Sequence, residues 1–517
     1  MTPTPTSLRV VIVKPSKYDA GGFVERFRRG FMPNSTVPHL ASMTPREVGG
    51  LPCEVVTVDE YVQTDIDYLR LFAPRPGERT LVALVGVQSH QLHRALDLGA
   101  LAVDRGAMAV VGGPHPMTCD TTMLQGSGVA FALAEAEVVW PAILEDARAG
   151  ELRRAYGRKQ RWEQQLDPPV LRPPPKRDLA RYAVPMLGVY PARGCPYSCN
   201  FCSVIKIAGH RVRSQPVETT LASLRAAKRA GVRFVMFTSD NFNKYPEVWD
   251  LLDAMISERI EIPFFAQCDA QIHRQEDLVE RMARAGCHQI FVGAESFNPE
   301  TLRGAHKFHN DPGRYAKIVA LCRENGITSH FSNILGFPQD TESGILQHLS
   351  TLRELSPDVA SFYILTPIPG TEQYDDFLRD GRITESNLDR YDGTCVTWRH
   401  PNLSNDDLRR LLFRCYGEFY RARDVVSRLV RLSRGRRDFR LSSALFAVFG
   451  LSTMSRFAAA RHTHPMAGGV VRVRRDAARD YRELRRRFFG IELAPLPGSL
   501  TLSPADEETN RRAKLTS

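Results

Sequence analysis

Short continuous apolar runs alternate with amphipathic stretches along most of the chain. In parallel sheets the strands are buried on both faces, so each strand has such a run. Before residue 150, runs of this kind lie at 8–13, 53–58, 81–87 and 107–111, and helical periodicity lies at 92–105. Alternating strands and helices predict an α/β fold, with a doubly wound domain of the Rossmann or flavodoxin-like type at 8–150.

A proline-rich segment separates this block from a second one. Residues 167–176 read DPPVLRPPPK, and proline drives the residue before it towards extended geometry. We therefore predict a linker at 151–183.

Six strand-and-helix units follow at 184–400. The predicted strands are 184–190, 233–238, 262–268, 289–293, 328–336 and 361–367, and the predicted helices are 217–230, 246–258, 278–285, 314–325 and 343–355. Eight strands close a TIM barrel, so six predict a partial, TIM-like (β/α)6 barrel. In such barrels the chemistry lies at the C-terminal ends of the strands.

The last block is basic. Residues 421–490 contain 18 arginines and five acidic residues, whereas the rest of the chain is nearly neutral, with 51 basic and 53 acidic residues. We expect a helical region at 401–505 that packs on the barrel, and a flexible tail at 506–517. The arginines leave peripheral contact with a membrane or a lipid substrate open. We expect no nucleic-acid partner, because aromatic side chains are not arrayed as a stacking platform.

Composition indicates a globular protein of the cytoplasm. The chain is 43% hydrophobic and 25% charged, and its ten cysteines are scattered, which is typical of a reducing compartment. The longest apolar stretch, 441–451, is too short to span a bilayer, and the N-terminus has no secretory signal. No feature of the sequence indicates an obligate oligomer.

Three cysteines stand out from the scattered ones. The loop after the first strand of the second block reads RGCPYSCNFC and contains Cys195, Cys199 and Cys202. Three thiolates in one short loop are suited to an iron–sulfur cluster. Structural zinc needs four ligands, and only His210 lies near enough in sequence to be the fourth. Isolated cysteines elsewhere are expected to be packing residues.

The cysteine loop and the strand ends resemble the radical S-adenosylmethionine superfamily. In that family the three cysteines hold a 4Fe–4S cluster whose fourth iron chelates S-adenosylmethionine. The reduced cluster cleaves this cofactor to a 5′-deoxyadenosyl radical. The segments VGAES at 292–296, FTSDN at 237–241 and TPIPG at 366–370 are similar to cofactor-binding segments. The resemblance implies S-adenosylmethionine contacts by Phe201, Ser239, Asp240, Gln267, Gly293, Glu295, Ser296, Gly336 and Pro367.

The first block resembles the cobalamin-binding domain that is fused to many radical enzymes. The matching segments are VGGPHP at 111–116 and AEAE at 134–137. The resemblance implies cobalamin contacts by Ser89, Gly112, Gly113, His115 and Glu135. Two departures matter: residues 14–18 lack the histidine motif that supplies a lower cobalt ligand, and Ala134 replaces a glycine.

These resemblances imply a cobalamin-dependent radical methyltransferase. It would methylate an unactivated carbon of a small molecule, lipid or natural product, with electrons from an external flavodoxin or ferredoxin. One alternative is a radical cyclase, rearrangement or oxidation enzyme with a degenerate cobalamin domain. Another is a non-catalytic iron–sulfur sensor. We assign no catalytic side chain.

Overall fold

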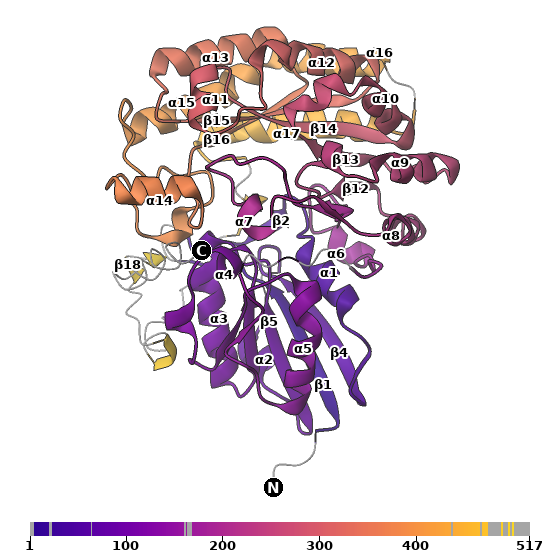
Figure 1. The fold of residues 1–517 in the computed structure, drawn as a ribbon, viewed down its shortest axis with the longest axis vertical. Helices are drawn as coiled ribbons and strands as arrows, with labels where there is room; N and C mark the ends of the chain where they lie inside the picture. Colours follow the sequence, from indigo (N-terminus) through magenta and orange to yellow (C-terminus); the bar gives the residue numbers. More distant parts are fainter. Residues whose placement is uncertain are drawn as a thin grey trace.

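The computed structural model contains two parallel sheets, one above the other, with helices around each (Figure 1). It describes residues 5–19, 23–63, 65–159, 162, 168–435, 438–465, 468–473, 487–489, 495–496 and 499–500. The predicted tail at 506–517 lies outside the described residues.

The N-terminal sheet has the strand order β3-β4-β1-β5-β6-β7-β8, and all its pairings are parallel except that of β3 with β4. Its strands are β1 (Ser7–Lys14), β3 (Glu47–Val48), β4 (Leu51–Asp59), β5 (Glu78–Leu84), β6 (Met108–Gly112), β7 (Val129–Ala132) and β8 (Ala155–Tyr156). The chain order reverses between β1 and β5, which is the flavodoxin-like arrangement. Ligands of such folds bind beyond the strand C-termini at this reversal.

Helices bury both faces of this sheet, which explains its continuous apolar strands. On one face, α2 (Tyr68–Phe72) and α3 (Leu92–Asp104) cover alternate strand residues. On the other, α1 (Thr36–Met43) and α5 (Ala136–Ala149) cover the rest. The predicted doubly wound domain is confirmed.

The second sheet is the predicted six-stranded partial barrel. Its order is β16-β15-β14-β13-β12-β9, with every pairing parallel. The strands are β9 (Met186–Val189), β12 (Phe234–Phe237), β13 (Phe264–Cys268), β14 (Cys287–Glu295), β15 (Thr328–Leu335) and β16 (Val359–Ile364). The helices between and after them are α8 (Val217–Ala230), α9 (Val248–Ser257), α10 (Glu276–Ala285), α11 (Pro299–Gly304), α12 (Tyr315–Glu324), α13 (Glu342–Leu355) and α14 (Glu372–Arg379).

Three C-terminal helices cover the open side of this barrel: α15 (Asn405–Phe419), α16 (Ala422–Gly435) and α17 (Leu441–Arg461). An edge strand leaves backbone groups unpaired. Two tyrosine hydroxyl groups satisfy such groups on the edge strand β16. The Tyr416 hydroxyl, on α15, bonds both the N–H and the C=O group of Phe362. The Tyr420 hydroxyl, just after α15, bonds both the N–H and the C=O group of Ala360. The predicted helical region therefore completes the barrel edge.

Some elements have no counterpart in the predictions. Strand β2 (Phe27–Gly30) pairs with β17 (Gly469–Arg472) from near the other end of the chain. Strand β8 joins the first sheet inside the segment predicted as a linker. Helix α17 extends ten residues beyond the predicted 441–451 stretch. By length and composition alone it could cross a membrane, but a third of its most apolar window is buried in the fold.

Candidate functional site

The cysteine loop leaves the barrel after β9, through the short strand β10 (Ala192–Arg193). Gly194 has φ +102°, and a Cβ there would lie 2.3 Å from the Arg211 carbonyl oxygen, so the turn requires glycine. Cys199 is buried, Cys195 and Cys202 are half-buried, and none forms a disulfide. The side-chain amide of Asn241 donates to the Cys195 sulfur at 3.9 Å.

The residues after β12 hold this loop. Asp240 accepts a hydrogen bond from the Gly194 N–H at 2.8 Å, and Ser239 accepts one from the Ala192 N–H at 3.3 Å. Burial raises the pKa of Asp240. Both residues were predicted to contact S-adenosylmethionine, but these contacts also give them a role in positioning the cysteine loop.

The end of β14 presents a buried carboxylate. Glu295 has φ +63°, an unusual conformation for a residue with a side chain. Its carboxylate accepts from the Lys307 ammonium at 3.3 Å and from the Ser332 hydroxyl at 3.3 Å. A Cβ on Gly293 would lie 2.5 Å from the Glu295 Oε1 atom, so glycine makes room for this carboxylate. The adjacent Ser296 is buried, and its hydroxyl accepts from the Asn298 N–H.

Lys307 connects this carboxylate to the cysteine loop. Its Nζ atom lies 5.9 Å from the centre of the Phe201 ring. Burial alone would lower the pKa of Lys307, but the charge of Glu295 and the nearby thiols raise it. The Phe201 ring packs edge-on against the ring of Phe337, the residue after Gly336, and the two ring centres are 5.9 Å apart. Phe201, Gly336, Gly293 and Glu295 thus belong to one connected region.

The other two predicted contacts lie apart from these interactions. Pro367 is buried in the loop after β16. Gln267 lies in the wall of a cavity inside the barrel.

The predicted cobalamin residues lie at the C-terminal edge of the first sheet. His115 is buried, and its Nδ1 atom lies 3.0 Å from the Ser89 hydroxyl. Gly113 has φ +141°, and a Cβ there would lie 2.1 Å from the Val87 nitrogen. A Cβ on Gly112 would lie 3.2 Å from the Ala132 Cβ. These glycines therefore let the turn after β6 pack closely against the backbone after β5 and against β7.

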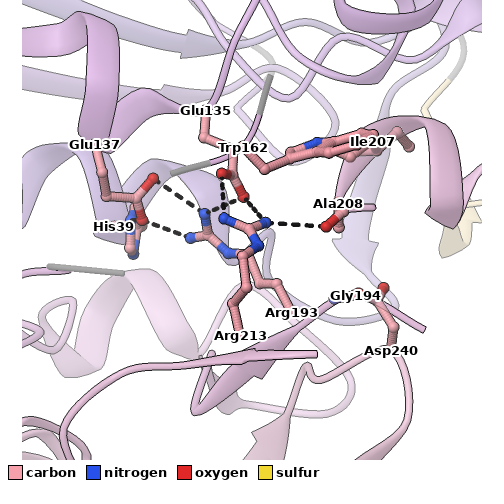
Figure 2. Close-up of polar contacts among 10 residues, drawn as sticks. All are labelled: His39, Glu135, Glu137, Trp162, Arg193, Gly194, Ile207, Ala208, Arg213 and Asp240. Carbon is pink, nitrogen blue, oxygen red and sulfur yellow. Dashed lines mark hydrogen bonds and ion pairs between the residues drawn. The ribbon is translucent and has the colours of Figure 1, made fainter. Parts of the chain in front are cut away.

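Glu135 takes part in an ion network between the two sheets (Figure 2). Its carboxylate accepts from Arg213 at 2.7 and 2.8 Å and from Arg193 at 3.2 Å. Glu137 accepts from Arg193 at 2.6 and 3.0 Å and lies 2.8 Å from His39. Burial alone would raise the pKa of Glu137, but the charge of Arg193 holds it well below its usual range. Because Arg193 directly precedes Gly194, this network ties the first sheet to the cysteine loop.

A cavity of about 220 Å³ adjoins this network. The first sheet and its helices contribute Gly86, Gly112, Gly113 and Trp140 to its wall. The barrel contributes Ala208, Arg193 and Asp240. The glycine-lined edge of one sheet therefore faces the segment that holds the cysteines.

The residues present fit a 4Fe–4S cluster better than zinc. Among the described residues, no three Cys, His, Asp or Glu side chains surround a single ion, and His210 is exposed. The ligands of a cuboidal cluster each bind a different iron atom, so their sulfurs need not converge on one point.

Four residues of the site were not predicted from the sequence to be functional: Lys307, Arg193, Arg213 and Glu137. An isolated arginine or lysine has no characteristic spacing from other residues that would mark it as functional in the sequence. The one available signal was position, since Arg193 adjoins the cysteine motif and Glu137 ends the AEAE segment.

Comparison with known protein families shows which superfamily the barrel resembles. Residues 189–352 match the sequence model of the radical SAM superfamily. The chain contains a radical SAM domain. The family implies a 4Fe–4S cluster and S-adenosylmethionine as cofactors.

Relatives of this radical SAM protein extend the likeness beyond the barrel. Bacteriochlorophyllide d C-8(2)-methyltransferase of Chlorobaculum tepidum is 24% identical over 415 residues, which are 75% of this chain and 86% of that protein. The radical S-adenosylmethionine methyltransferase TsrM of Kitasatospora setae, solved with cobalamin and a 4Fe–4S cluster, has a TM-score of 0.60 at 16% identity. The match covers 87% of this chain and all of TsrM.

A second solved structure shows the same fold. The cobalamin-dependent S-adenosylmethionine radical enzyme OxsB has a TM-score of 0.58 at 14% identity, over 87% of this chain and 72% of OxsB. The shared fold includes both sheets of the chain.

Proposed function

We propose that the protein is a cytoplasmic, cobalamin-dependent radical S-adenosylmethionine methyltransferase that methylates an unactivated carbon of a small molecule. The observation that carries this proposal is the cavity where the glycine-lined edge of the first sheet meets the cysteine-loop segment. Two cofactors held on these facing edges can act on one substrate. Methyltransferases and cobalamin enzymes among the relatives support the same proposal.

In this proposal Cys195, Cys199 and Cys202 ligate the cluster. Glu295, held by Lys307 and Ser332, accepts hydrogen bonds from the amino group of S-adenosylmethionine, and Phe201 lies against its adenine. Ser239 and Asp240 fix the cysteine loop. When bound, the cluster and S-adenosylmethionine supply the hydrogen-abstracting radical, and cobalamin supplies the methyl group.

A cobalamin fits the C-terminal edge of the first sheet, where Gly112 and Gly113 line the cavity. The wall of this cavity between the sheet and α5 is apolar at Trp140 and Val139. The side chain of Lys14, at the end of β1, donates to the Gln91 amide oxygen at 2.6 Å and the Gly86 carbonyl. We infer that the loop after β1 supplies no lower cobalt ligand.

The test is anaerobic reconstitution with iron, sulfide and cobalamin, followed by reduction in the presence of S-adenosylmethionine. We expect 5′-deoxyadenosine to form and a corrinoid absorption spectrum to remain with the protein after gel filtration. Formation of 5′-deoxyadenosine without corrinoid binding would favour a non-methylating radical enzyme. Absence of 5′-deoxyadenosine would favour an iron–sulfur sensor. Cys199→Ala should lose the iron chromophore, whereas Cys322→Ala, at a buried position outside the loop, should keep it.

We also propose two partners. An external flavodoxin or ferredoxin supplies the electron to the cluster.

An anionic membrane surface contacts α16 and α17, where exposed apolar side chains such as Phe449 and Phe457 accompany the arginines Arg434, Arg456 and Arg461. Sedimentation with phosphatidylglycerol vesicles, but not with phosphatidylcholine vesicles, is the expected result. Equal recovery with both kinds of vesicle, or with neither, would refute the electrostatic contact.

A further inference from the structure

A cavity with mostly apolar walls lies inside the barrel and has a volume of about 510 Å³. Inward-facing side chains of the strands line it, among them Met186, Phe234, Met236, Phe265 and Phe291. Pockets that enclose drug-sized ligands have volumes of about 300–1,000 Å³. The cavity is therefore large enough for a complete small molecule.

The polar groups of this wall are few, and several are already bonded to each other. Gln289 donates to the Nδ1 atom of His330 at 2.7 Å, and the Nε2 atom of His330 donates to Ser361 at 2.7 Å. Both ring nitrogens are therefore engaged, and burial lowers the pKa of His330 to about 3, so the ring is neutral. Arg29 is exposed and bonds the Tyr182 carbonyl, and no described acidic residue lines the wall. In the interior of the cavity, away from the exposed Arg29, a charged group would lose its hydration without finding a partner.

Helix α17 forms the outer wall and the rim. The Phe446 ring stacks on Phe234 with the ring centres 6.0 Å apart. Phe449 lines the cavity although 60% of its surface is exposed, so it lies where the cavity meets the surface. An apolar rim admits an apolar molecule with little loss of hydration.

The cavity leads along the strands towards the cofactor region. On β14, Gln289 and Phe291 line the cavity, and Gly293 follows on the same face, roughly 7 Å beyond Phe291 at a rise of about 3.3 Å per residue. The register of the strand shifts after Gly293, but the Glu295 Oε1 atom lies 2.5 Å from the position of a Cβ on Gly293, so the carboxylate lies on the same side. A ligand in the cavity can extend one end to the neighbourhood of Glu295.

We propose that this cavity binds the substrate, and that the substrate is an uncharged, hydrocarbon-rich small molecule that enters beside α17. The site of reaction follows from the function proposed above, whereas binding in the cavity needs no cofactor. Gln267 and the Tyr363 hydroxyl are among the groups of the wall that can hydrogen-bond a single polar substituent of the substrate.

The test measures binding of the uncharged fluorophore 1,6-diphenylhexatriene to the full chain purified without reconstitution. Ala447 and Thr453 lie on α17 and line the cavity, whereas Ser442 lies on the same helix, is exposed and does not line it. We expect saturable binding by the wild type, at least tenfold weaker binding by Ala447→Trp and by Thr453→Trp, and wild-type binding by Ser442→Trp. Circular dichroism shows which variants fold. One folded cavity variant is enough for the comparison with the wild type.

Two results would overturn the proposal. One is absence of saturable binding by the wild type, and the other is equal binding by the wild type and a folded cavity variant. Because the assay contains no cluster and no S-adenosylmethionine, its result is independent of radical chemistry. Normal fluorophore binding by a protein that forms no 5′-deoxyadenosine would contradict the proposed function and leave the apolar cavity established.

Discussion

Glu135→Gln should destabilise the contact between the two sheets by about 3 kcal/mol. The carboxylate makes three charge-assisted hydrogen bonds, two with Arg213 and one with Arg193. Hydrogen bonds to charged groups contribute about 1.5–3 kcal/mol each, and removing one partner of a buried ion pair costs about 3–5 kcal/mol. Glutamine keeps one acceptor oxygen, and Arg193 keeps its bonds to Glu137, so the lower end of that range applies.

Urea unfolding of the full chain at pH 7 measures this loss. With a slope of about 3 kcal/mol/M, the midpoint should fall by about 1 M. The matched control is Glu145→Gln on α5, the helix that begins directly after Glu135. Its carboxylate pairs with Arg148 at 2.8 Å, but 53% of the Glu145 side chain is exposed, so less than about 1 kcal/mol should be lost. Equal midpoints for the two variants would show that the buried network does not stabilise the fold.

Three further predictions concern other parts of the molecule. Burial alone would raise the pKa of Glu60, but the charges of Arg94 and Arg26 lower it to about 2. The stabilisation of the fold by ionised Glu60 is therefore complete above about pH 4.5 and is lost as the pH falls towards 2. The difference in urea midpoint between the wild type and Glu60→Gln should shrink across that interval. A constant difference would contradict this prediction. Gly293→Ala should weaken S-adenosylmethionine binding at least tenfold in calorimetry with unchanged iron content, because the new Cβ displaces Glu295; unchanged affinity would argue against this carboxylate as a ligand. Tyr420→Phe should cost about 1–3 kcal/mol of unfolding free energy, since it leaves buried backbone groups of β16 unpaired, and a neutral result would mean that the edge is satisfied in another way.

Hydrophobic pattern predicted most of the fold because parallel strands are buried on both faces. The six barrel strands and the five predicted helices between them lie within a few residues of their observed bounds, whereas the short helix α11 has no counterpart in the predictions. Strand β2 was missed because it reads FRRG, with two exposed arginines, and its partner β17 is distant in sequence. A short antiparallel pair of this kind leaves no local periodicity.

The candidate site was predictable only where chemistry imposes spacing. The three cysteines share one loop, so their arrangement is visible in the sequence. The partners of Glu135 are not, because Arg193 and Arg213 approach it only once the two sheets meet. Likewise, nothing local shows that Asp240 bonds the Gly194 N–H of the cysteine loop.

The position of α17 after all six strands of the barrel has a consequence for biosynthesis. During translation, the six strands of the barrel leave the ribosome before the helix that covers their apolar interior. The nascent protein therefore exposes phenylalanine-rich surface for as long as the last helices take to be made, which is the condition under which chains aggregate. Chains whose synthesis stops before α17 should depend on chaperones to stay in solution.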